Sequence, residues 1–241
     1  MKIDLTILGG SRPKLLKRTL QSFHEKIFVN FEISSVYANL DLFGGHQQDR
    51  LECIKILNTF FLNPEIACPD SNSFGLAVKN LWLQPKSDTF LHLEDDWLAI
   101  SKIEPIQISK YLKGKTKQIA LHHGAFHSYF RNRFHWSKHN TFGYEVIPNF
   151  SRPIFSTSPS FLNSNFALSC AELMDPGMDP EKQLSNGSVA RLSEFTSKYR
   201  CRLLKKNSGM DYVQDIGRDW RELRGINKTF EDGASIWTND V

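Results

Sequence analysis

Residues 90–97 read FLHLEDDW, and this stretch decides the fold that we expect. An apolar run with the length of a buried strand passes directly into three carboxylates. Successive side chains of a strand point to opposite faces, so we expect Glu94 and Asp96 on one face and Asp95 on the other. Two carboxylates on one face suit Mg²⁺ or Mn²⁺, which take oxygen ligands and share their coordination shell with substrate phosphates. The alternative is an acidic turn that caps the next helix or pairs with lysine and arginine.

Strands and helices alternate around this stretch. We expect strands at residues 3–7, 33–38, 65–68, 89–93 and 118–121, and helices from residue 13, from residue 47, and at 75–82 and 105–111. Such alternation predicts a parallel sheet with right-handed crossovers, in which ligands bind beyond the carboxyl ends of the strands. Polar clusters follow the expected strands, so we expect four of them to converge on one crevice: residues 9–12, 39–41, 70–73 and 94–96.

The pattern changes after Leu121. Residues 122–160 are rich in histidine and aromatic side chains and show no clear period. Helices are expected at 165–174 and 180–199, and a short strand at 201–204. The tail beyond Arg224 is polar, and we expect it to wrap over the molecule or to fray. No linker is evident, so we expect residues 1–241 to form a single domain with two halves, 1–121 and 122–241.

The composition is that of a globular protein rather than a nucleic-acid binder. The chain has 241 residues, 40% of them hydrophobic and 23% charged, with a net charge of +4. This excess is mild, so we expect no dedicated nucleic-acid-binding patch. The four cysteines are far apart, which argues against structural zinc and disulfides. No window is apolar enough to span a bilayer, and no signal peptide is evident, so we expect a cytoplasmic protein.

Three segments in this order carry a family resemblance. The opening TILGGSRPKLLKRTLQSF (residues 6–23), SNSFGLAVKNLW (71–82) and HLEDDW (92–97) resemble the family 2 glycosyltransferases and their GT-A relatives. The likeness covers residues 3–100 well and the remainder loosely. Gly-Ser-Arg-Pro at 10–13 replaces a loop that often contains Asn-Arg-Pro, and Glu94-Asp95-Asp96 replaces the usual Asp-x-Asp.

The resemblance implies a fold and an activity. The fold would be α/β, a GT-A (Rossmann-like), mostly parallel sheet flanked by helices, with a smaller C-terminal acceptor lobe. Residues 1–121 would bind a nucleotide-sugar donor, and residues 122–241 would hold the acceptor and catalytic groups. The activity would be transfer of a sugar, from a UDP-sugar by preference, to an acceptor hydroxyl, with Mn²⁺ or Mg²⁺ as cofactor and with inversion. The acceptor stays open among a glycan, a lipid-linked sugar, a protein and a modified base.

The resemblance also assigns the donor and metal residues. The nucleoside and phosphates would be bound by a set of residues from the strand ends and the following loops: Leu8, Gly9, Arg12, Asn39, Asp41, Asn72, Lys79, Glu94 and Asp95. In DYVQDIGRDW (residues 211–220), Asp215 stands where many GT-A enzymes have a histidine, and it would join Asp96 at the metal. Arg218 would offset the charge of the departing diphosphate.

An inverting enzyme needs a base that takes the proton of the attacking hydroxyl, and carboxylates do this work. Family members carry this acid near the start of a helix in the second lobe, and MDPGMDPEKQL (residues 174–184) is the best match. Glu181 is therefore the candidate base, ahead of Asp179 or Asp175, with Asp96 as the other catalytic group. The alternative is that these acids complement a helix dipole. A retaining enzyme would need no such base.

Two other functions remain open on the sequence. ILGGSRPKLL (residues 7–16) has some likeness to the opening of sugar-nucleotide pyrophosphorylases, but their loop has more glycine and a Thr-Arg-Leu element that is absent here. A non-catalytic nucleotide- or carbohydrate-binding module is the second alternative, and the acidic motif with Glu181 argues against it. A Walker-type phosphate loop is excluded, because GGSRPK lacks the required spacing.

Overall fold

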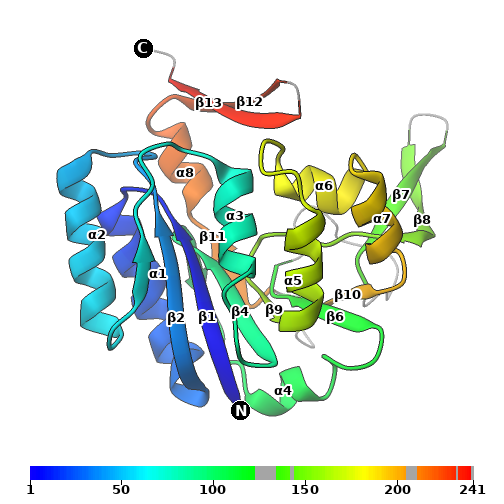
Figure 1. The fold of residues 1–241 in the computed structure, drawn as a ribbon, viewed down its shortest axis with the longest axis horizontal. Coiled ribbons are helices and arrows are strands. Elements are labelled where there is room, and N and C mark those ends of the chain that lie inside the picture. Colours follow the sequence, from blue (N-terminus) through cyan, green and yellow to red (C-terminus); the bar gives the residue numbers. More distant parts are fainter. Residues whose placement is uncertain (123–133, 142–143, 205–210, 232, 240–241) are drawn as a thin grey trace.

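The computed structural model describes residues 1–122, 134–141, 144–204, 211–231 and 233–239. Its central sheet consists of β1 (Lys2–Gly9), β2 (Glu32–Leu40), β3 (Glu65–Ala67), β4 (Thr89–Glu94), β6 (Thr116–Ala120), β9 (Ser160–Asn163) and β10 (Arg200–Leu203). These seven strands lie in the order β10-β6-β9-β4-β1-β2-β3, and the order from β10 to β2 can be followed in Figure 1. All pairings are parallel except those of β9, which runs antiparallel to both β4 and β6.

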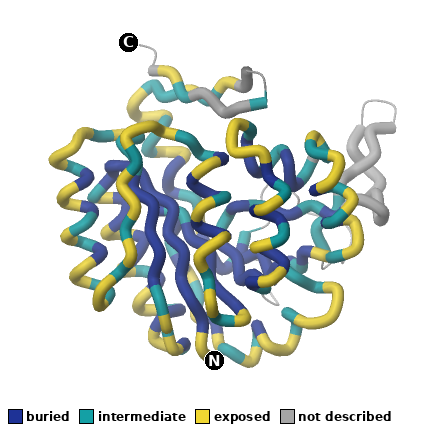
Figure 2. The backbone as a smooth tube through the Cα atoms, in the orientation of Figure 1, coloured by how far each residue is buried: buried dark blue, intermediate teal, exposed yellow. Residues whose placement is uncertain are grey.

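Helices cover both faces of this sheet (Figure 1). Helices α1 (Pro13–Lys26) and α2 (Gln47–Phe60) pack with one hydrophobic core cluster, and α3 (Phe74–Trp82) and α5 (Ser164–Leu173) pack with the other. The stripe Leu16, Leu20 and Phe23 of α1 is fully buried, as its helical spacing predicted. Figure 2 shows the central strands buried and the outer helix faces exposed. The α/β, mostly parallel architecture expected from the sequence is therefore confirmed.

The second half departs from the expected elements in several places. The helix expected over residues 180–199 is two helices, α6 (Pro180–Asn186) and α7 (Ala190–Thr196). Gly187 separates them with a φ of 69°, a left-handed conformation that ends a helix and that glycine adopts without strain. The insertion of β9 between β4 and β6 was also not predicted, because local periodicity carries no information about which strands pair.

The tail beyond Arg224 wraps over the molecule as a hairpin, which is one of the two arrangements expected for it. Strands β12 (Ile226–Glu231) and β13 (Ala234–Asn239) pair antiparallel and lie over one end of the molecule (Figure 1). They follow β11 (Val213–Asp215) and α8 (Gly217–Glu222), and β11 pairs with β5 (Trp97–Ala99). The C-terminal segment is thereby brought back to the end of β4.

The remaining described elements are the short helix α4 (Pro105–Ser109), the 3-10 turn η1 (Phe28–Asn30) and the hairpin of β7 (Trp136–Thr141) with β8 (Tyr144–Pro153). None of the helices in the described ranges is long and apolar enough to cross a membrane. The four cysteines are all free thiols, as expected.

Candidate functional site

A crevice of about 710 Å³ opens at the carboxyl ends of β1, β2 and β4. Backbone hydrogen bonds tie these strand ends together. The Asp95 N–H donates to the Leu8 carbonyl (3.0 Å), the Asp41 N–H to the Gly9 carbonyl (3.1 Å), and the Ser11 N–H to the Phe43 carbonyl (2.9 Å). Segments from both halves of the chain line the crevice: Leu8–Gly10, Arg12, Asp41–Gly44, Asn72, Phe74, Glu94–Trp97, Ser158, Glu181, Asp215, Arg221, Ile226, Lys228 and Trp237. The predicted convergence of strand ends is confirmed.

Arg12 and Asp95 form a buried ion pair at the base of the crevice. The carboxylate of Asp95 accepts hydrogen bonds from the Arg12 guanidinium and from the Gly10 N–H (3.1 Å), and its backbone carbonyl accepts one from Thr19 Oγ1 (2.7 Å). Burial raises the pKa of Asp95 to about 6, against the opposing effect of Arg12. This network joins the loop after β1, helix α1 and the end of β4.

The expected alternation of Glu94, Asp95 and Asp96 is wrong in one respect. Strand β4 ends at Glu94, and the chain turns at Asp95 and Asp96, so strand geometry does not orient these two carboxylates. Asp95 points inward to Arg12 instead of to an opposite sheet face. Its contacts are those of a residue that holds the loops in place. The sequence could not show this, because the partner of Asp95 lies 83 residues away.

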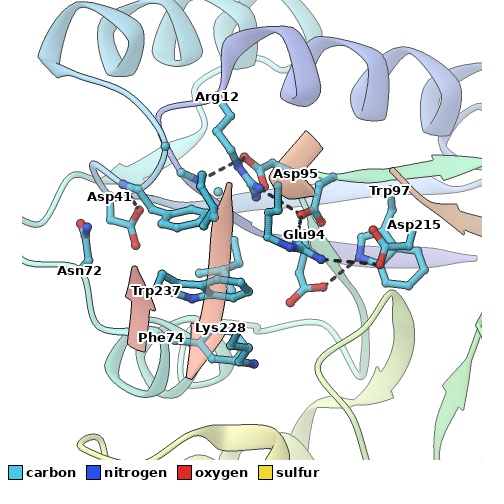
Figure 3. Close-up of a pocket in the computed structure, with 18 of the residues that line it drawn as sticks. Arg12, Asp41, Asn72, Phe74, Glu94, Asp95, Trp97, Asp215, Lys228 and Trp237 are labelled. Atoms are coloured by element: carbon cyan, nitrogen blue, oxygen red, sulfur yellow. Dashed lines mark hydrogen bonds and ion pairs between the residues drawn. The ribbon is translucent and has the colours of Figure 1, made fainter. Parts of the chain in front are cut away.

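Two further carboxylates lie at the same end of the crevice, as Figure 3 shows for Glu94. Glu94 accepts a hydrogen bond from Trp97 Nε1 (2.9 Å). Burial, with repulsion from Asp96 and Glu181, raises the pKa of Glu94 well above its usual range. Glu181 lies in the first turn of α6, where it accepts a hydrogen bond from Thr157 Oγ1 (3.1 Å), and Asp179 caps that helix.

Asp96 and Asp215 are brought together by backbone pairing. Asp215 pairs with Trp97 in the β5–β11 ladder, and the Ile216 N–H donates to the Asp96 carbonyl (2.9 Å). Gly217 follows at the start of α8, and a Cβ there would overlap the Asp96 carboxylate, so glycine is required for this approach. Between them lies Arg221, with Nη1 3.3 Å from Asp96 Oδ2 and Nη2 3.9 Å from Asp215 Oδ2.

The other end of the crevice is aromatic and amide-lined (Figure 3). Asn72 Oδ1 accepts a hydrogen bond from the Leu42 N–H (3.1 Å), which joins the loops after β2 and β3. Asp41 Oδ1 accepts one from the Phe43 N–H (2.8 Å), and burial raises the pKa of Asp41. The Phe43 ring lies 5.4 Å from that of Trp237 in β13. This end offers flat apolar surfaces beside an amide and a carboxylate.

Most of the residues predicted from the sequence line this crevice, and three do not. Asn39 is buried within β2. Lys79 points to the far side of α3, where its Nζ donates to the Met174 carbonyl (2.8 Å). Arg218 is exposed, and its backbone N–H donates to Asp215 Oδ1 (3.1 Å). Arg221, one helical turn further along α8, takes the place expected for Arg218.

Sequence reasoning missed several lining residues, among them four with aromatic or cationic side chains in segments without a clear signal. Phe43 lies in an expected loop without period, and Arg221, Lys228 and Trp237 lie in the segment whose fold was not predicted. The sequence held one usable signal for Arg221: a helix that begins after Asp215 presents residues three or four apart on one face. Lys228 and Trp237 had no such signal, because the hairpin that orients them has no apolar alternation of its own.

The comparisons with known proteins support the fold. No protein-family model and no curated protein matches the chain. Among solved structures, the chain is similar to TarS of S. aureus (TM-score 0.54, 14% identity, 93% of this chain and 38% of that one) and to its fragment 1–349 (0.53, 15%, 93% and 63%). It is also similar to HddC from Yersinia pseudotuberculosis (0.50, 11%, 91% and 97%).

The chain spans less than two thirds of these two TarS chains. Identities of this size establish the fold alone. The chain has the GT-A-like α/β fold of these structures, as the motifs in its first hundred residues predicted.

Proposed function

We propose that this protein is a glycosyltransferase that transfers a sugar from a nucleoside-diphosphate sugar to an acceptor hydroxyl. The observation that carries the proposal is the division of the crevice into two chemically different ends. One end has aromatic rings beside Asp41 and Asn72, with Lys228 lying against two of these rings, and the other end has carboxylates beside Arg221. A nucleotide sugar has the matching parts, since its base is flat and its diphosphate is charged. The two halves of the chain, 1–121 and 122–241, would act as one domain, because both line this crevice.

The aromatic end suits the nucleoside. Phe43, Phe74 and Trp237 offer ring faces on which a base can stack, and Asn72 offers amide groups. Asp41 would accept a hydrogen bond from the N3–H of uracil, which supports a UDP-sugar as the preferred donor. Leu8 and Gly9, at the end of β1, would contact the nucleoside from the base of the crevice.

Glu181 would be the base. It lies in the crevice with the other carboxylates, and it comes from the half of the chain expected to hold the acceptor. Its carboxylate would take the proton of the acceptor hydroxyl while the bond to the diphosphate breaks on the opposite side of the sugar, which inverts the anomeric carbon. Thr157, which donates to Glu181 Oε1, would hold the carboxylate in place.

The residues present fit a divalent cation, provided that the donor phosphates complete its coordination. The described residues form no group of three or more histidine, cysteine or acidic side chains arranged to hold a metal. The crevice nevertheless carries an excess of negative charge, because six acidic side chains line it against three basic ones. Asp96 and Asp215 would hold Mn²⁺ or Mg²⁺ together with phosphate oxygens. Bound there, the ion would neutralise charge on the departing diphosphate.

The test is a reaction screen. UDP-, GDP-, CDP- and dTDP-sugars are incubated with Mn²⁺ and with glycan, lipid-linked, protein and modified-base acceptors, and the released nucleotide is measured. We expect nucleoside diphosphate to be released with one donor, UDP-linked by preference. Formation of a nucleotide sugar and pyrophosphate from a nucleoside triphosphate and a sugar phosphate would instead indicate a pyrophosphorylase. Nucleotide binding without turnover of any donor would indicate a binding module.

The four free thiols support a reducing cytoplasm as the compartment in which the protein acts.

A further inference from the structure

We propose that Arg221 is the diphosphate-binding cation of the donor site, and that in the free protein Asp96 and Asp215 hold it where a divalent cation would bind. Arg221 and the divalent cation then compete for the same two carboxylates until a nucleoside diphosphate binds. This inference rests on the proposed function and adds to it a regulation of the same site.

The position of Arg221 is determined by the backbone around it. The β5–β11 pairing sets Asp215 beside the end of β4, and Gly217 lets the start of α8 approach the Asp96 carboxylate. The guanidinium of Arg221 lies within 3.3 Å of Asp96 and 3.9 Å of Asp215, so it bridges the two residues best suited to a metal. Asp96 Oδ2 also lies 3.1 Å from Arg12 Nη1, so it is charge-compensated before any ion binds.

In the same position, the guanidinium also contacts an aromatic ring. Arg221 lies over the Trp237 ring, 5.3 Å from its centroid, and the Nζ of Lys228 lies at the same distance from that ring. Trp237 thus contacts two cations from different elements, and all three side chains line the crevice. The Arg221 side chain is partly exposed, so it can turn along the ring without crossing the packed core.

Charge links the position of Arg221 to the binding of the divalent cation and of the nucleotide. While Arg221 bridges Asp96 and Asp215, a divalent cation must displace a guanidinium to reach them, which weakens its binding. A nucleoside diphosphate offers Arg221 a better partner, since guanidinium and phosphate form paired charge-assisted hydrogen bonds. Movement of Arg221 to the diphosphate leaves Asp215 without this partner and Asp96 paired with Arg12 alone, so both carboxylates can contact a divalent ion. Nucleotide and cation should therefore strengthen each other's binding, and Arg221 should carry part of this coupling.

The experiment measures Mn²⁺ affinity and UDP affinity separately. Free Mn²⁺ is counted by electron paramagnetic resonance in the absence of nucleotide, and UDP is titrated by calorimetry at saturating Mn²⁺. The proteins are the wild type, Arg221→Gln, and Arg218→Gln as the matched control. Arg218 lies on the same helix and loses the same charge, but it lies outside the crevice.

We expect Arg221→Gln to bind Mn²⁺ more tightly than the wild type and UDP about tenfold to a hundredfold more weakly, while Arg218→Gln changes neither affinity. Opposite shifts in two affinities cannot arise from a general loss of structure. Arg221→Lys, which keeps the charge, should leave Mn²⁺ affinity near that of the wild type.

Unchanged or weaker Mn²⁺ binding by Arg221→Gln would overturn this inference while leaving the proposed function intact. If the wild type binds no nucleoside diphosphate at any Mn²⁺ concentration, the proposed function itself fails, and the inference fails with it.

Discussion

Two regions of the molecule build the crevice, and they are held in place by different means. The acidic turn after β4 is anchored in the interior, where Asp95 is fully buried against Arg12 and three strand ends are joined by backbone hydrogen bonds. The hairpin of β12 and β13, at the end of the C-terminal segment, lies on the surface (Figure 2). Its contacts with the rest of the molecule include a tilted ring contact of Trp237 with Phe43, the pair of Lys228 with Asp179 (3.3 Å), and a hydrogen bond from the Asp179 N–H to the Gly233 carbonyl (2.9 Å).

The difference indicates which region stabilises the fold and which region mainly contributes to ligand binding. A residue in the acidic turn is coupled to the core, so its loss should destabilise the protein. A residue in the C-terminal hairpin has few core contacts, so its loss should weaken binding and leave stability nearly unchanged.

The largest expected effect is on turnover and concerns Glu181 in α6, which lines the crevice together with both regions. Glu181→Gln removes the proposed base but keeps the shape of the side chain and its hydrogen bond with Thr157. We expect kcat to fall by about 10²–10⁴-fold, while the affinity for the nucleotide stays near that of the wild type. Steady-state kinetics and calorimetry on the same preparation measure both. A variant that keeps its kcat would remove Glu181 from the mechanism and support a retaining enzyme.

The next effect is on stability and belongs to the acidic turn. Arg12→Met leaves Asp95 buried without its partner, and we expect the free energy of unfolding to fall by about 3–5 kcal/mol at neutral pH. Urea denaturation followed by circular dichroism measures this loss. The double variant Arg12→Met/Asp95→Asn, which removes both charges, should recover part of it. A stable single variant with weak nucleotide binding would show instead that Arg12 acts as a ligand contact.

The C-terminal segment should show the reverse behaviour. Trp237→Ala removes one ring face from the nucleoside end, and we expect nucleotide affinity to fall by about fivefold to a hundredfold, in keeping with about 1–3 kcal/mol for base stacking. The urea midpoint should stay close to that of the wild type. Thr238→Ala, the exposed neighbour, is the control and should change neither quantity. Equal affinity in both variants would place the base elsewhere.

The smallest effect is a pH dependence that belongs to the scaffold. Burial lowers the pKa of His92 in β4 to about 3, from 6.5, so the folded state keeps this histidine neutral where the unfolded chain binds a proton. The contribution of His92 to the free energy of unfolding is therefore fully present above pH 6.5 and decreases as the pH falls below this value. About 1.4 kcal/mol is lost by pH 5.5. His92→Gln should flatten this slope in urea denaturation between pH 7.5 and 5.5. An unchanged slope would show that the pH dependence of stability comes from other groups, such as His135, whose pKa is also lowered.

The two regions also differ in how well their structure can be predicted from the sequence. The strands and helices of the first half have apolar residues at regular spacing, and that regularity predicted the elements and the convergence of their polar ends. Nothing local predicts that β9 runs antiparallel between β4 and β6, since this depends on pairing across about 70 residues. Arg221 and Trp237 were missed for the same reason, because they reach the crevice only through contacts with distant segments. The resemblance assigned Lys79 and Arg218 to the donor site. In the structure, Lys79 donates to the Met174 carbonyl, and Arg218 is exposed outside the crevice.

The central claim is that the acidic turn and the C-terminal segment form a single nucleotide-sugar site. Hydrogen–deuterium exchange with and without UDP and Mn²⁺ tests it directly, because it reports on both regions at once. We expect slower exchange at residues 8–12 and 94–97 together with residues 215–237 when both ligands are present. Slower exchange in the first region with no change in the second would show that the hairpin lies outside the site.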